Sequence, residues 1–160
     1  MYYIEEANKI PCLYDVDVLV CGGGPAGIGA AIRAAREGVS VMVVEAQDCL
    51  GGIATAGMMS HWGGRSSSKI MQEIFELTYN KAQEVGWCND DRCGKNAIHH
   101  EVQKVVLEEM MLKESIKVLY YTKVCKAVVE NDTIVGVIIE NKSGRGSGVM
   151  SSRYGSMDSL

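Results

Sequence analysis

The chain has 160 residues, of which 47% are hydrophobic and 22% are charged, a composition typical of one globular domain. Its net charge of −4 argues against a broad affinity for nucleic acids or for anionic membrane surfaces. No apolar run approaches the ~18 residues that a membrane-spanning helix needs, and the opening segment MYYIEEANK lacks the features of a secretory signal, so we expect a cytoplasmic protein.

A β-α-β unit is predicted near the start of the chain. Residues 16–21 (VDVLVC) are apolar, rich in β-branched side chains and followed by glycines, which is the pattern of a buried parallel strand. Small and apolar residues then recur at helical spacing over residues 25–37, and Gly38 supplies the helix stop. Residues 39–44 (VSVMVV) give a second strand, which ends at Glu45.

Two amphipathic helices are predicted in the middle of the chain. The first spans residues 69–85, and the positions expected on its buried side are Ile70, Ile74, Leu77 and Tyr79. The second spans about residues 99–113, and the positions expected to face inward are Val102, Val105, Val106, Met110 and Leu112.

The last part of the pattern predicts strands and then a tail. Residues 116–124 read as a third parallel strand, and residues 126–141 as a β-hairpin that turns at Asn131-Asp132. After Lys142 the sequence is Ser/Gly-rich and aperiodic. We therefore expect an α/β, Rossmann-like fold with a parallel sheet, extra helices and a hairpin over residues 1–142, followed by a flexible tail over residues 143–160.

The six residues 22–27 read G-x-G-x-x-G, the pattern of a dinucleotide-binding loop. Gly22 would allow a sharp turn out of the strand, Gly24 a close approach of a pyrophosphate, and Gly27 tight packing of the helix on the strand. The phosphates would lie at the helix N-terminus, and Glu45, at the end of the next strand, would accept hydrogen bonds from a ribose. Strand, helix and acid together favour this site over a tight turn without a ligand.

A glycine doublet, Gly51-Gly52, follows six positions after Glu45 in the segment EAQDCLGGIATAG. This pattern resembles the flavoprotein arrangement, in which the doublet brings a second stretch of backbone against the pyrophosphate and the flavin side. FAD is longer than one β-α-β unit can hold, so such a second contact is physically sensible and favours FAD over NAD. A plain flexible glycine loop remains the alternative explanation of the doublet.

The segment IPCLYDVDVLVCGGGPAGIGAAIRAAREGVSVMVVEAQDCLGGIATAG, with IMQEIF and EVQKVVLEEM further on, resembles FAD-dependent oxidoreductases related to the flavoprotein subunit of heterodisulfide reductase. The resemblance covers roughly residues 8–145. It implies that FAD is the cofactor, and that a small molecule or a protein acts as redox partner.

The resemblance also implies roles for individual residues. The residues implied at the FAD pyrophosphate are Gly22, Gly24, Pro25, Ala26 and Gly27. Glu45 and Ala46 would lie at the adenosine ribose, and the backbone of Val124 near the adenine. The residues implied on the path to the flavin are Gly51, Gly52, Thr55 and Ala56. No catalytic residue is visible, because the flavin itself carries the redox chemistry.

The chain departs from this family after the hairpin, where an ATGD-like segment and a substrate-facing region would follow. Instead, NKSGRG leads into the serine-rich tail. We therefore expect an incomplete domain, the N-terminal portion of a longer flavoprotein. A non-catalytic FAD- or ADP-binding fragment and an NAD-binding Rossmann protein are the competing functions.

The cysteines are irregularly spaced, at positions 12, 21, 49, 88, 93 and 125. Relatives of heterodisulfide reductase carry iron–sulfur clusters, and a [4Fe–4S] cluster takes four thiolates. A zinc site made of Cys88, Cys93 and His99 or His100 is a second alternative. Because the chain has no compact cysteine run, the spacing favours ordinary core and loop thiols over either metal site.

Overall fold

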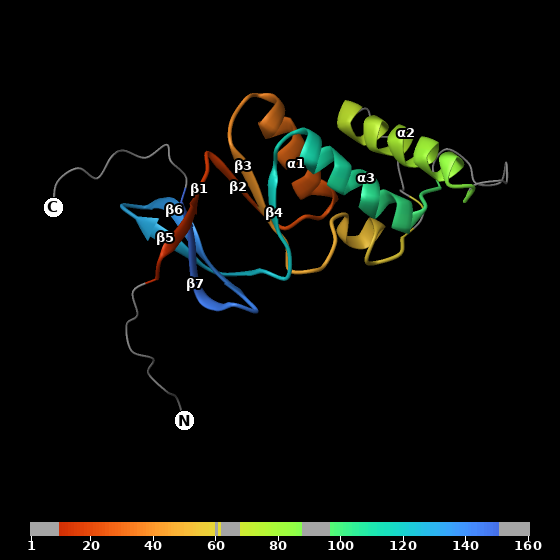
Figure 1. Cartoon of the computed structure of the whole chain (residues 1–160). Coiled ribbons are helices and arrows are strands. Elements are labelled where there is room, and N and C mark those ends of the chain that lie inside the picture. Colours follow the sequence, from red (N-terminus) through yellow and green to blue (C-terminus); the bar gives the residue numbers. More distant parts are fainter. Residues whose placement is uncertain (1–9, 60, 62–67, 88–96, 151–160) are drawn as a thin grey trace.

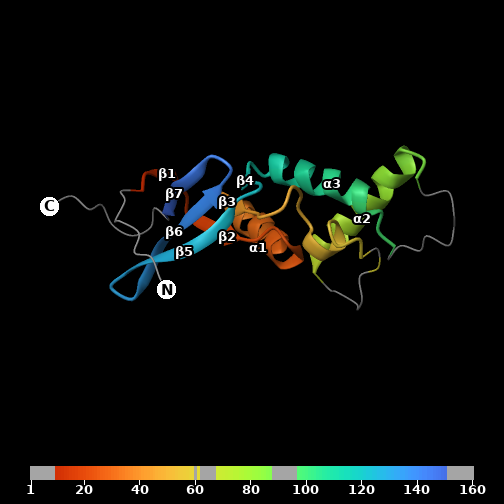
Figure 2. The same cartoon turned by 90° about the horizontal axis from the view of Figure 1, so that it is seen from below.

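A computed structural model describes residues 10–59, 61, 68–87 and 97–150 of the chain. Two β-sheets and three α-helices are present in these ranges. A three-stranded sheet lies between the helices on one side and a four-stranded sheet on the other (Figures 1 and 2). The structure thus confirms the α/β class predicted from the sequence.

The central sheet is parallel and has the order β2-β3-β4, made of Val18–Cys21, Val41–Val44 and Lys117–Leu119. β3 is the middle strand, and its four residues are buried because both faces of the sheet are covered. The helix α1 (Pro25–Arg36) connects β2 to β3, so the predicted β-α-β unit is confirmed. Gly38, at a φ of +84°, ends the turn that follows α1, as predicted.

The predicted third strand is too long at its C-terminal end. β4 stops at Leu119, and Tyr121 adopts a φ of +50°, far from the negative φ of regular strand residues. The N–H of Tyr121 donates to the carbonyl of Gln47 at 3.0 Å, so the chain turns away from the sheet here. The next strand, β5 (Lys123–Glu130), belongs to the other sheet.

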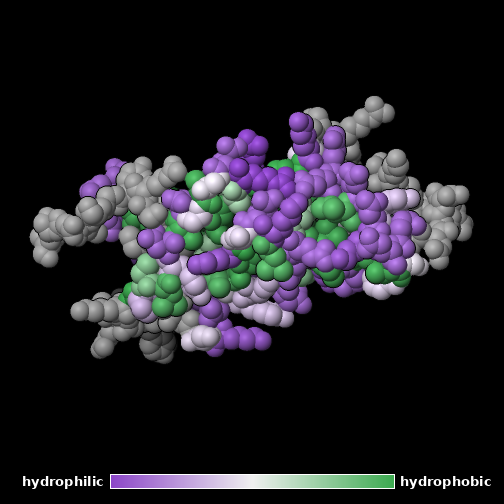
Figure 3. Space-filling view, turned by 45° about the horizontal axis from the view of Figure 1, so that its top comes forward, coloured by the Kyte–Doolittle hydropathy of each residue, from purple (hydrophilic) through white to green (hydrophobic). Residues whose placement is uncertain are grey.

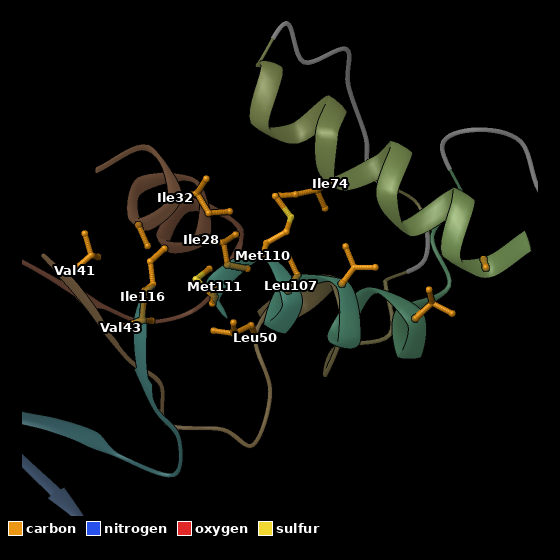
Figure 4. Packing of buried hydrophobic residues seen from close by; sticks show 14 residues of the cluster. Ile28, Ile32, Val41, Val43, Leu50, Ile74, Leu107, Met110, Met111 and Ile116 are labelled. Carbon is orange, nitrogen blue, oxygen red and sulfur yellow. The ribbon is translucent and has the colours of Figure 1, made fainter. Parts of the chain in front are cut away.

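The helical face of the sheet holds the larger hydrophobic core. α1, α3 (His100–Lys113) and the sheet enclose Ile28, Val43, Leu107 and Met111, which meet in Figure 4. α2 (Lys69–Glu84) packs on α3 through Ile74.

Some residues predicted to be buried on these helices are exposed. They are Leu77 and Tyr79 on α2, and Val105 and Leu112 on α3. Residues 74, 78 and 82 face the core from α2 instead, a stripe of i, i+4 and i+8 positions. Among the described elements α2 packs chiefly against α3, so the rest of its surface has no second layer to bury it.

The second sheet covers the opposite face of β3. Its order is β1-β7-β6-β5, where β1 is Cys12–Asp15, β6 is Thr133–Asn141 and β7 is Gly144–Met150. Alternate residues of β6, including Val137 and Ile139, point at Met42 and Val44 of β3 and form a second core.

The predicted hairpin is confirmed as β5 and β6, with both turn residues at positive φ, +47° for Asn131 and +59° for Asp132. These angles suit a tight two-residue turn between twisted strands.

The predicted flexible tail is wrong for residues 144–150, which form β7 between β6 and β1. A strand forms there, although four of its seven residues are glycine or serine, because the ladder bonds come from the backbone and β6 offers a free edge after the turn at residues 141–143. The N–H of Ser143 donates to Oδ1 of Asn141 at 2.9 Å and supports that turn. Residues 151–160 lie outside the described residues, and the boundary between domain and tail stays a prediction.

Candidate functional site

The glycine loop (residues 22–27) connects the carboxyl end of β2 to α1. Gly22 has a φ of +107°, a conformation that side-chain-bearing residues avoid, and its N–H donates to the carbonyl of Val44 at 2.8 Å. The sharp turn predicted at Gly22 is therefore present. It directs the chain from the carboxyl end of β2 into α1.

Gly27 allows α1 to approach β2 closely. A β-carbon at this position would overlap the carbonyl oxygen of Gly22 and would lie 3.2 Å from Cγ1 of Val20. The close packing of helix on strand that the motif predicts is therefore present at Gly27.

The N-terminus of α1 has no capping side chain. Gly24 is the N-cap residue, Pro25 is the first helical residue, and the first turn contains no acidic side chain. The first helical hydrogen bond runs from the N–H of Ile28 to the carbonyl of Gly24 at 2.9 Å, so the N–H groups of Ala26 and Gly27 have no acceptor within the helix. The positive end of the helix dipole is thus not compensated by the helix's own residues.

The space beside Gly24 is open. Apart from its two chain neighbours, a β-carbon on Gly24 would meet no heavy atom of the described residues within 4 Å, in contrast to the crowded position of Gly27. Backbone N–H groups and open space at the start of a helix are what a phosphate group needs.

Glu45 follows β3 and points toward the glycine loop. Its side chain is 8% exposed, and its Oε2 accepts a hydrogen bond from the N–H of Gly23 at 2.6 Å. Its Oε1 accepts from the N–H of Gln47 at 2.8 Å. Each carboxylate oxygen has two acceptor positions, so each can still accept a hydroxyl donor.

The glycine doublet lies directly against the glycine loop. The N–H of Gly51 donates to the carbonyl of Gly23 at 2.8 Å, and a β-carbon on Gly52 would lie 3.2 Å from the Cα of Gly24. Both residues of the doublet have positive φ, +103° and +53°. Two separate stretches of backbone therefore meet at Gly23, a residue that the motif leaves unspecified and that sequence reasoning missed.

The other predicted site residues lie around this junction. Thr55 is buried, and its hydroxyl donates to the carbonyl of Leu50 at 2.5 Å, inside the loop that contains the short 3₁₀ helix η1 (Gly52–Ala54). Ala46 is exposed, and Ala56 is half-buried. Val124 lies at the start of β5, two residues beyond Thr122, whose N–H donates to the carbonyl of Glu45 at 2.9 Å.

Two cysteines lie near the site as thiols. Burial raises the pKa of Cys21, the last residue of β2, and of Cys49, whose Sγ lies 4.0 Å from Oγ1 of Thr55. A raised pKa disfavours the reactive thiolate. No group of three or more metal-ligating side chains occurs in the described residues; Cys88 and Cys93 of the alternative zinc site lie outside them.

A cavity of about 370 Å³ lies between α2 and α3, away from the glycine loop. Leu77, Val106 and Met110 contribute its apolar lining, and charged side chains such as Arg36 surround them. In Figure 3 an apolar area bordered by hydrophilic residues lies over these two helices. Arg36 is the last residue of α1, whereas the glycine loop includes its first turn, so the two places are at opposite ends of this helix.

No helix in the described ranges is both long enough and apolar enough to cross a membrane.

Comparison with curated proteins gives relatives that include a transhydrogenase and a thiazole synthase. The chain is 32% identical over 104 residues to the soluble pyridine nucleotide transhydrogenase of Marinobacter nauticus, covering 61% of this chain and 20% of that protein. It is 28% identical over 125 residues to the thiamine thiazole synthase of Aeropyrum pernix, covering 77% of this chain and 43% of that protein. The chain thus spans less than half the length of these relatives.

Solved structures with the same fold include flavoproteins. A myxobacterial chondrochloren halogenase, described as a variant of FAD-dependent halogenases, matches with a TM-score of 0.58 and 16% identity over 87% of this chain and 36% of that one. A flavocytochrome c3 fumarate reductase matches with a TM-score of 0.57 and 16% identity over 88% of this chain and 33% of that one.

The model of a protein family described as FAD dependent oxidoreductase matches residues 17–154, which include the glycine loop, Glu45, the glycine doublet and the hairpin. The chain belongs to the FAD dependent oxidoreductase family.

Proposed function

We propose that this chain is the cofactor-binding portion of an FAD-dependent oxidoreductase, in which the diphosphate of FAD lies against the glycine loop. One observation carries the proposal: at the uncapped N-terminus of α1, no atom of the described residues other than the chain neighbours lies within 4 Å of a β-carbon placed on Gly24. Free N–H groups and the helix dipole favour a doubly charged diphosphate there. The family to which the chain belongs uses FAD, which supports that choice of dinucleotide.

The proposal assigns each group of residues a part of the cofactor. The residues proposed at the diphosphate are Gly22, Gly24, Pro25, Ala26 and Gly27. Glu45 would accept hydrogen bonds from the ribose hydroxyls, with Ala46 beside it. The residues proposed along the path to the flavin are Gly51, Gly52, Thr55 and Ala56, and the backbone of Val124 would lie near the adenine. The bound flavin supplies hydride or electron-pair transfer, and the chain supplies binding and orientation.

Three narrower points belong to the same proposal. The motif LGG-x-A-T-A-G supports kinship with the flavoprotein subunit of heterodisulfide reductase.

The free thiols of Cys12, Cys21, Cys49 and Cys125 support a reducing compartment such as the cytoplasm. The redox partner would be a small molecule or another protein bound by regions of a longer protein.

The test is titration of FAD into the full chain and into Gly24→Val. Gly24 has an extended backbone, with φ −71° and ψ 180°, so valine fits the free protein, whereas its side chain fills the space proposed for the diphosphate. We expect the wild type to bind FAD and NAD to bind more weakly. Gly24→Val should keep its circular dichroism spectrum and lose FAD affinity by at least about tenfold, since a displaced charge-assisted hydrogen bond alone is worth about 1.5–3 kcal/mol.

Gly29→Ala is the matched control, because a β-carbon at Gly29 in α1 also meets no described residue outside its own stretch of helix within 4 Å but lies beyond the loop. It should bind FAD as the wild type does. A wild-type chain that does not bind FAD, or a folded Gly24→Val that binds it equally well, contradicts the proposal.

A further inference from the structure

Tyr121 is held in a constrained backbone conformation beside the residue proposed to bind the ribose. Its φ of +50° is unusual for a bulky side chain, and such conformations persist where the surroundings impose them. Three backbone hydrogen bonds impose it here. The N–H of Glu45 donates to the carbonyl of Leu119 at 2.8 Å. The N–H of Tyr121 donates to the carbonyl of Gln47 at 3.0 Å, and the N–H of Thr122 donates to the carbonyl of Glu45 at 2.9 Å.

The aromatic ring of Tyr121 is accessible and carries a cation on one face. The residue is 53% exposed, and Nζ of Lys142 lies 4.8 Å from the ring centroid. Lys142 directly follows β6, so the pair joins the second sheet to the segment that contains Glu45. The cation–π contact restrains the ring and leaves about half of the side chain open to other molecules.

We propose that Tyr121 is a stacking platform for the adenine base of the bound nucleotide, and that it makes the site selective for adenine nucleotides. The inference rests on the proposed function, because it takes the ribose to lie at Glu45. A base attached to that ribose lies next to the backbone segment 45–47, to which Tyr121 is bonded. Planar bases stack on aromatic rings through their π faces, so the exposed ring provides the contact that the glycine loop cannot give to a base.

The alternative role is purely structural: Tyr121 and Lys142 would only fasten the turn after β6 to the central sheet. In that case, loss of the ring would change stability and would affect all ligands of the site alike. Ligands with and without an adenine therefore separate the two roles.

The experiment measures binding of ADP and of inorganic pyrophosphate to the full chain by calorimetry. Tyr121→Asn removes the ring and keeps a residue that tolerates positive φ, so the backbone conformation is retained. We expect Tyr121→Asn to bind ADP about tenfold more weakly than the wild type, as expected for loss of one stacked base. Its affinity for pyrophosphate should stay within about twofold, the range of a surface substitution without other effects.

Two variants serve as controls. Tyr121→Phe keeps the ring and should bind ADP within about twofold of the wild type. Tyr79→Ala removes an exposed tyrosine of α2, outside the site, and should bind both ligands normally.

Equal ADP affinity in Tyr121→Asn and wild type overturns the inference, and so does a parallel loss of ADP and pyrophosphate. If the wild-type chain binds neither ligand, the proposed function itself is wrong, and the stacking role falls with it. A selective loss of ADP in Tyr121→Asn, with Tyr121→Phe intact, supports the inference.

Discussion

The carboxylate of Glu45 accepts a hydrogen bond from the N–H of Gly23 at 2.6 Å, which joins the end of β3 to the glycine loop that follows β2. The carbonyl of the same glycine accepts from Gly51 at 2.8 Å. The carboxylate proposed for the ribose and the loop proposed for the diphosphate are thus parts of one hydrogen-bonded unit. The relative positions of the two ligand contacts are set before any ligand binds.

Glu45→Gln should loosen this unit. Glutamine offers one acceptor oxygen where glutamate offers two, so either Gly23 or Gln47 loses its partner and faces an NH₂ group. We expect the free energy of unfolding to fall by about 1–3 kcal/mol, because the lost bond is buried and charge-assisted. Urea denaturation measures this change.

Glu37→Gln is the control for that measurement. Glu37 forms an ion pair with Arg33 on the exposed side of α1, and removing such a pair should change stability by less than about 1 kcal/mol. A Glu45→Gln protein as stable as Glu37→Gln would show that the contact with Gly23 does not stabilise the loop.

Gly27→Ala should destabilise the fold strongly. The added β-carbon overlaps the carbonyl oxygen of Gly22, a backbone atom that cannot move without breaking the turn. We expect a loss of about 3 kcal/mol, at the upper end of overpacking effects. The same substitution at Gly29, two residues along the helix in open space, should stabilise by about 0.5–1 kcal/mol. Equal thermal stability of the two variants would contradict the close helix–strand contact.

Arg36 links the three helices, and this link should depend on pH. Its guanidinium donates to both oxygens of Glu73 on α2 at 2.7 and 2.8 Å, and its Nε donates to Glu114, just after α3, at 2.8 Å. Arg36 holds the pKa of Glu73 below the ordinary value of 4.5. A lowered carboxyl pKa gives stability that is complete above the ordinary value and is lost as the pH falls through the lowered one.

Arg36→Met should therefore be less stable than the wild type by about 1–2 kcal/mol at pH 7, since the pairs are partly buried and one is bidentate. The difference between the two proteins should shrink as the pH is lowered below the ordinary carboxyl range. Arg33→Met, which breaks only the exposed pair with Glu37, serves as the control and should show little difference at any pH. A difference between Arg36→Met and wild type that is independent of pH would contradict the assignment to Glu73.

The parts of the fold that the sequence predicts well are those set by local chemistry. Gly38 and the Asn131-Asp132 pair are found at positive φ, as their residue types predict. The β-α-β unit follows from one apolar run, one helical period and a second apolar run. These patterns can be recognised without knowing which segments pack against the other face of the sheet.

The errors arise where the partner of a segment decides its structure. β7 forms from a glycine-rich segment because β1 and β6 supply backbone partners on both sides, which no side-chain pattern records. β1 was missed for the same reason. Leu112 was predicted to face inward from α3 but is 75% exposed, so its environment depends on the tertiary arrangement.

In the candidate site, too, the locally determined features were predicted and the feature that depends on tertiary contacts was not. The motif gives the turn at Gly22 and the close packing at Gly27, because these demands act within a few residues. The role of Gly23 in joining Glu45 and Gly51 was not predicted, since it depends on contacts across three separate segments. The only sequence signal for this role was that three glycines follow one another. The structure shows why Gly23 is one of them, since a β-carbon at this position would lie 3.1 Å from Oε2 of Glu45.

The most direct test of the central claim is a titration of ADP into the ¹⁵N-labelled full chain, followed through backbone amide shifts. If the diphosphate binds the free N–H groups at the start of α1, the largest shifts should occur at Gly24, Ala26 and Gly27, with a second group at Glu45 and Gln47. Shifts confined instead to the cavity around Arg36, or no saturable shifts at all, would contradict the claim.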